Sequence, residues 1–209
     1  MTLPSVAAHT GAPDMRRRIL EAAVRCFARS GFHGGSMQEI CSEAQMSAGA
    51  LYRYFPSKDT IIEAIATEER TRNAEFTSRL DVERDVLDTL CDTGFAHMRD
   101  MIARGQSALC AEVCAEAQRN PRIRSIFAAN HAEVHGAIRK ALAKAQALGE
   151  VSAEIDLDVA ATMLMAIGDG LIVRMPFEAE SGLDQIQPKL KDLVRRMLAP
   201  ERAESMKVQ

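Results

Sequence analysis

The sequence of 209 residues has no tryptophan, only two tyrosines and no run of eighteen apolar residues. A chain without such a run is not expected to cross a membrane. Met1 to Pro13 lacks the basic and then apolar order of a signal peptide. Glycine-rich phosphate loops after a strand, Gly-x-Ser-x-Gly elbows and His-Glu-x-x-His motifs are also missing, so we expect no enzyme, cofactor or bound metal.

Cysteine is scarce as well. The five cysteines are an odd number and lack the spacing of a disulfide framework. Free thiols of this kind are typical of a reducing compartment, so we expect a cytoplasmic protein.

The residues that are present favour helices. Hydrophobic residues make up 47% of the chain, and alanine, leucine, glutamate and arginine are frequent. This composition predicts an all-α fold. We expect a disordered lead over residues 1–13, the first domain over 14–60, the second over 61–200 and a tail over 201–209.

One stretch, Gln45 to Phe55, organises the N-terminal part. It follows the short amphipathic run Ser36 to Ala44 after a break of two or three residues, and helices joined so tightly must cross. Leu51 and Phe55 form the apolar stripe of the second helix. The residues outside that stripe can meet phosphates and base edges: Ser47, Ala48, Gly49, Tyr52 and Arg53.

Two neighbouring features support a DNA-binding face. Ser36 and Glu39 have the spacing of a capping box, so a helix should begin at Met37, with Ser36 and Gln38 at its phosphate-attracting end. Ser36 as a simple cap and Gln38 as a simple surface residue is the alternative. Lys58 lies in the first turn of the next helix, where the helix dipole makes a cation unfavourable unless an external anion binds it. Residues 14–58 carry seven Lys/Arg against four acids, within a net charge of −3.

These motifs together resemble the N-terminal domain of the TetR/AcrR family of transcriptional regulators. The runs Phe27 to Phe32, Ser36 to Ile40 and Ser47 to Asp59 carry the resemblance. It implies a three-helix DNA-binding domain with a helix-turn-helix, followed by a helical C-terminal effector-binding and dimerisation domain. It also implies a homodimer whose first three helices bind double-stranded operator DNA, with contacts from Ser36, Met37, Gln38, Ala48, Gly49, Tyr52, Arg53, Tyr54 and Lys58. The family usually has glycine at Gln45, so we expect a slightly different turn there. Ala48 can meet only a thymine methyl.

The C-terminal part predicts helices with short breaks, and Glu116 to Arg122 and Ala166 to Leu171 resemble effector domains of one branch of the family. Leu157 to Met175 is apolar nearly all round, which favours burial against both its own subunit and a partner. We expect a four-helix dimer interface, with a buried monomer core as the alternative. Its expected residues are Ala166, Gly168, Gly170, Leu171, Ile186, Leu190, Leu193, Val194 and Met197.

Soft side chains in this part suggest a small-molecule site, although any single one of them is more often ordinary core. They are Phe95, Met98, Met101, Cys110, Val113, Cys114, Phe127, His131, Met163 and Ile167. We therefore expect a repressor that an unidentified small molecule releases from a palindromic operator. The alternative is a sensor that responds to thiol oxidation or metal through Cys110 and Cys114, joined for zinc by His131 and His135 if they face each other.

Overall fold

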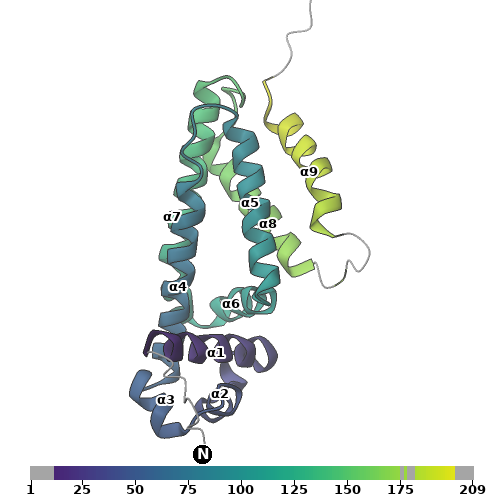
Figure 1. The fold of residues 1–209 in the computed structure, drawn as a ribbon. Helices are drawn as coiled ribbons and strands as arrows, with labels where there is room; N and C mark the ends of the chain where they lie inside the picture. The colour runs from purple at the N-terminus through teal and green to yellow at the C-terminus, as the bar shows by residue number, and fades with distance from the viewer. Residues whose placement is uncertain (1–11, 175–176, 178–181, 201–209) are drawn as a thin grey trace, which may run out of the picture. The chain divides into compact units, whose positions relative to one another are not determined.

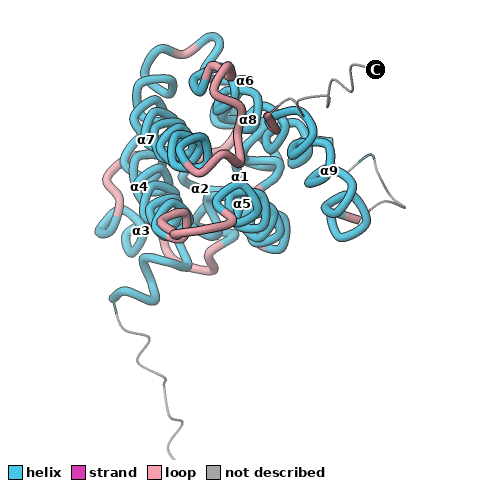
Figure 2. Tube along the Cα trace, turned by 90° about the horizontal axis from the view of Figure 1, so that it is seen from above, coloured by secondary structure: helices cyan, strands magenta, loops and turns pink. Residues whose placement is uncertain are grey.

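The computed structural model describes residues 12–174, 177 and 182–200, which form helices joined by short loops (Figures 1 and 2). Within that part of the chain no strand is present, which confirms the all-α prediction. The predicted lead is described only from residue 12, and the predicted tail lies outside the described residues. The helices are α1 (Ala12–Gly34), α2 (Met37–Glu43), α3 (Ala48–Tyr54), α4 (Lys58–Ser78), α5 (Val86–Ala103), α6 (Ser107–Arg119), α7 (Pro121–Ala147), α8 (Leu157–Arg174) and α9 (Leu183–Leu198).

The chain divides into two compact units, residues 1–67 and 68–209, and α4 runs through the division. Unit 1 has a core of side chains from α1 to α4 that includes Phe27, Ile40, Leu51 and Ile61, all without solvent exposure. Seven-residue helices such as α2 and α3 are too short to be stable alone, so this burial holds them in place.

The end of α1 shows why glycine is needed there. Gly31 breaks the helix with φ 70°, in the left-handed region that favours glycine. Phe27 and Phe32 then pack edge to face, with ring centroids 5.1 Å apart. A Cβ on Gly35 would lie 2.8 Å from the Phe27 ring, so a larger residue would displace that pair.

The turn between α2 and α3 keeps a left-handed residue although it lacks glycine. Gln45 adopts φ 54°. The turn was expected to differ slightly because it has glutamine where the family usually has glycine. Gln45 nevertheless adopts the left-handed conformation. A side chain in this region costs on the order of 1 kcal/mol, which the surrounding packing must offset.

Unit 2 contains α5 to α9 and the second half of α4. In Figure 1, α5 and α7 run lengthwise and α6 lies across one end of them. Fully buried Val86, Leu142 and Leu198 belong to one apolar cluster, and Phe95, Ile172 and Leu183 belong to a second.

One helix of unit 2, α5, is capped by a side chain that is distant in sequence. Asp85, which precedes α5, forms no side-chain capping hydrogen bond. Instead, the Glu150 carboxylate accepts hydrogen bonds from the backbone N–H groups of Val86 (3.2 Å) and Leu87 (2.9 Å). Such caps satisfy donors that the helix itself leaves open.

Ionic and polar contacts join α9 to α5. Asp88 binds Arg195 (2.6 Å), Asp92 binds Lys191 (2.8 Å), and Arg99 binds Asp184 (2.8 Å). The pKa of Asp88 lies below its ordinary value, mainly because Arg195 donates hydrogen bonds to the carboxylate.

None of the described helices has the length and apolarity that a bilayer span requires.

Candidate nucleic-acid interface and internal cavity

Helices α2 and α3 start from side-chain caps. The Glu39 backbone N–H donates to Ser36 Oγ (3.2 Å), and Glu39 Oε2 accepts from the Ser36 backbone N–H (2.8 Å). This confirms the capping box and the start at Met37. Ser47 Oγ accepts from the Ala50 backbone N–H (3.3 Å) in the same manner at α3.

Burial of Leu51 and Phe55 turns the opposite side of α3 outward, as the sequence predicts. Tyr52 is 51% exposed, against 0% for the adjacent Leu51. Of the ten residues expected to contact DNA, seven are exposed and three are half-buried. The exposed ones are Ser36, Gln38, Ser47, Ala48, Gly49, Tyr52 and Arg53; the half-buried ones are Met37, Tyr54 and Lys58.

Lys58 already has protein partners. Its ammonium donates to the backbone carbonyls of Phe32 and Gly35, the latter at 3.2 Å. The group therefore holds the end of α1 next to Ser36, which starts α2. This second role was not anticipated from the sequence, because a pairing across 26 residues leaves no local pattern.

Several arginines of α1 are also engaged within unit 1. Arg18 donates to the carbonyl of Ala44 (3.0 Å). Arg25 and Arg29 both bind the Glu43 carboxylate, at 2.8 and 3.4 Å. Hydrogen bonds from Arg25 first, and Arg29 second, lower the pKa of Glu43. Part of the positive charge of residues 14–58 is therefore paired within unit 1, where it joins α1 to α2.

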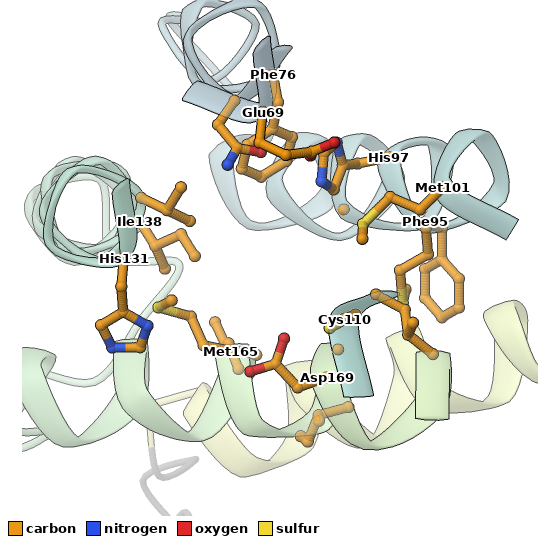
Figure 3. Close-up of a pocket in the computed structure, with 18 of the residues that line it drawn as sticks. Glu69, Phe76, Phe95, His97, Met101, Cys110, His131, Ile138, Met165 and Asp169 are labelled. Carbon is orange, nitrogen blue, oxygen red and sulfur yellow. The ribbon is translucent and has the colours of Figure 1, made fainter. Parts of the chain in front are cut away.

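Unit 2 encloses a cavity of about 330 Å³, within the range of small-molecule sites (Figure 3). The structure brings nine of the ten residues expected for a ligand to this cavity. They are Phe95, Met98, Met101, Cys110, Val113, Cys114, Phe127, His131 and Ile167. Met163 is not among the lining residues; it packs against the larger apolar cluster instead.

Polar side chains also line the cavity, and the sequence reasoning missed them as ligand-binding candidates. They are Glu69, Asn73, His97, Gln106, Asn130, Asp169 and Lys191. Figure 3 shows Asp169 pointing into the space opposite Glu69 and His97. Glu69, Asn73 and Phe76 share one face of α4 by their spacing, which was a usable signal.

Burial shifts two of these groups in opposite senses. Desolvation lowers the pKa of His97, and the nearby Glu69 opposes that shift. Desolvation raises the pKa of Asp169, and His131 opposes it. Both shifts favour the neutral forms, as expected for groups beside apolar walls.

Cys110 and Cys114, which both line the cavity, lie one turn apart on α6. A hydrogen bond from Cys110 lowers the pKa of Cys114 to about 7, and the same interaction raises the pKa of Cys110. His131 lines the cavity, but His135 does not. The Nε2 atom of His135 lies 3.3 Å from the carbonyl oxygen of Asp158. Among the described residues, no three His, Cys, Asp or Glu side chains are grouped to hold a metal ion.

Apolar side chains remain uncovered on α8 and α9. On α8, Val159 is 64% and Val173 38% exposed, and Ala166 is exposed midway between them. Leu193 and Met197 on α9 are 59% and 44% exposed. We call Val159, Met163, Ala166, Gly170 and Val173 the α8 stripe, because their spacing of four and three residues places them on one helix face.

The expected interface residues divide into two groups. Ala166, Gly170, Leu171, Ile186, Leu193 and Met197 are exposed or half-buried, whereas Gly168, Leu190 and Val194 line the cavity. The expectation for Val194 is corrected: it is only 4% exposed and belongs to the core of its own chain, which leaves little surface for a partner.

A helix-turn-helix with an exposed second helix, followed by a helical unit with a cavity, defines a DNA-binding transcriptional regulator. Residues 19–65 match the model of the bacterial regulatory proteins of the tetR family, and residues 83–199 match that of the BetI-type transcriptional repressor C-terminal domain. The protein belongs to the TetR family. Both matches are to transcriptional regulators, which confirms the expectation that the chain is not an enzyme.

Named relatives agree with this assignment. The chain is 31% identical to the transcriptional regulator UidR of Escherichia coli K12 over 81% of this chain and 85% of that protein. It is 26% identical to the repressor AcnR of Corynebacterium glutamicum over 92% and 98%. The structure of Salmonella enterica GusR is similar with a TM-score of 0.74 and 32% identity, covering 90% of this chain and 98% of that one. These names give no support to the thiol- or metal-responsive alternative.

Proposed function

We propose that the protein is a repressor that binds a palindromic operator as a homodimer and leaves it when a small molecule occupies the cavity of unit 2. The observation that carries this function is the outward face of α3: buried Leu51 fixes the helix while Tyr52, 51% exposed, projects away from it. Small residues at its start, Ala48 and Gly49, allow close approach to base edges. Such a protein acts in the cytoplasm, where bacterial operators are.

Dimerisation is proposed through the α8 stripe together with Leu193 and Met197. Exposed apolar side chains at heptad spacing favour helix pairing. Added Cβ atoms at Gly168 and Gly170 would meet nothing within 4 Å in the single chain, so there is room for a second backbone at the half-buried Gly170. A twofold pair would place two α3 helices one DNA turn apart, roughly 34–36 Å.

Ligand control is proposed to act through α4. This helix begins at Lys58, which binds the end of α1, and continues to Glu69, Asn73 and Phe76, which line the cavity. The ligand would bind more tightly to a dimer arrangement in which the two α3 helices have a different separation from that required on DNA. A preference of about 3 kcal/mol for that arrangement would weaken DNA binding about 150-fold.

The test combines selection of genomic fragments on the purified protein with light scattering. We expect one palindromic sequence to be enriched and a dimeric mass in solution. Leu193→Arg should yield a monomer with weak operator binding, because it places a charge in the proposed interface. Leu148→Arg is the matched control. Leu148 is 50% exposed, close to the 59% of Leu193, but it lies beyond α7 and outside the proposed interface. A monomeric parent protein, or equal binding to all duplexes, would refute the proposal.

A further inference from the structure

We propose that the cavity ligand is an amphipathic organic amine, whose ammonium group binds Asp169 and whose hydrocarbon body packs against methionine and phenylalanine side chains. The inference rests on the ligand-controlled function proposed above and adds the chemical class of the ligand.

Asp169 is the first reason. Its carboxylate points into the cavity from α8 (Figure 3), although the residue is exposed to solvent in the single chain. It forms no hydrogen bond or ion pair with another described residue. Among the described residues, only His131 lowers the pKa of this carboxyl group, and burial raises that pKa in spite of the interaction. A carboxylate beside an apolar space without a bound partner favours a cationic ligand.

The other charged residues of the cavity are already balanced. Glu69 pairs with Arg72 on the same helix, and Lys191 pairs with both Asp88 and Asp92. The lowered pKa of His97 favours its neutral form. The cavity therefore offers one acidic group whose charge lacks an ion pair within the described residues, and that group is Asp169.

Gln106 is an independent second observation. It is only 6% exposed and lines the cavity, yet its side-chain oxygen has no hydrogen-bond partner among the described residues. Buried polar atoms are almost always paired, so an unpaired one at a cavity wall indicates where a ligand supplies the partner. A hydroxyl or N–H on the ligand, separate from its ammonium, would satisfy this acceptor.

The remaining wall suits the hydrocarbon part of such a molecule. Met98, Met101 and Met165 supply polarisable thioethers, and Phe76 and Phe95 supply aromatic rings. Aromatic faces attract cations, and methionine adapts to irregular shapes. An anionic ligand would instead bring its charge toward Asp169.

The experiment is isothermal titration of the full-length protein with three probes that share one body: 4-phenylbutylamine, 4-phenylbutan-1-ol and 4-phenylbutyrate. We expect the amine to bind at least about tenfold more tightly than the alcohol, and the carboxylate more weakly still. Asp169→Asn should weaken amine binding on the order of 10- to 100-fold and leave the alcohol unchanged. Asp158→Asn, the same change three turns earlier on α8 at a residue that does not line the cavity, is the matched control.

A fourth probe tests Gln106. The amine with a phenolic hydroxyl, 4-(4-aminobutyl)phenol, should bind more tightly than 4-phenylbutylamine, and Gln106→Leu should abolish that difference. Equal affinity of the two amines for the parent protein would refute the role of Gln106.

Thermal unfolding without ligand separates a binding defect from misfolding. A carboxyl group whose pKa is raised by folding destabilises the fold at pH values above its ordinary pKa, where it must ionise. Asp169→Asn should therefore keep or increase Tm at pH 7 while losing the amine. Binding of the alcohol or carboxylate as tight as that of the amine, no binding of any probe, or unchanged amine affinity in Asp169→Asn would overturn the proposal. DNA binding, measured separately without probes, decides the proposed repressor function independently.

Discussion

In unit 1 the candidate residues project outward from two helices of seven residues each, whereas in unit 2 they line an internal space. The outward face comes from a stretch between Ser36 and Lys58, in which caps join residues three positions apart. The cavity draws on every helix from α4 to α9. One surface is fixed by local sequence and a few buried anchors, and the other by the packing of the whole unit.

The largest expected effect breaks the anchor of the outward face. Leu51→Ala removes the fully buried side chain of α3, and it should lower the free energy of unfolding of unit 1 by about 2–5 kcal/mol. Tyr52→Ala, its exposed neighbour, should change stability by less than about 0.5 kcal/mol but weaken operator binding at least about tenfold. Denaturant unfolding and fluorescence anisotropy separate the two effects. Equal stability losses would contradict the division between anchor and contact.

Lys58 tests whether a residue of this face positions others or touches DNA itself. Lys58→Met removes the hydrogen bonds to Phe32 and Gly35 and should cost about 1–3 kcal/mol of stability. If the ammonium binds only these carbonyls and no phosphate, Lys58→Met should leave the slope of log DNA affinity against log salt concentration unchanged. Arg53→Met should lower that slope by about 1 per subunit without loss of stability. A reduced slope in Lys58→Met would show that this ammonium also contacts phosphate.

The smallest expected effect is a gain. Gln45→Gly relieves the left-handed conformation in the turn before α3, and it should stabilise unit 1 by up to about 1 kcal/mol. Thermal unfolding measures it, with Gln38→Gly as a control in α2, where glycine should destabilise by less than about 1 kcal/mol. Loss of stability in Gln45→Gly would mean that contacts of the glutamine side chain outweigh the backbone strain.

The same contrast explains how much the sequence could predict. The capping box, the start of α2 at Met37 and the burial of Leu51 and Phe55 follow from local patterns. The cavity was predicted only in its soft apolar part, because methionine and phenylalanine indicate adaptable packing wherever they lie. Gln106 and Asp169 were missed as ligand-binding candidates, since nothing in their neighbourhoods indicates which helices they will face. Lys58 was recognised as unusual from the helix dipole, but its partners depend on tertiary structure.

The α8 stripe has small residues, Ala166 and Gly170, between the larger Val159 and Val173 at its ends. In a pair built on this stripe, the two backbones would come closest at the middle. A related chain with leucine at the position of Gly170 would be held away from this one by the added side chain. The stripe would thus act against mixed pairs and help keep each regulator in a cell with its own copies.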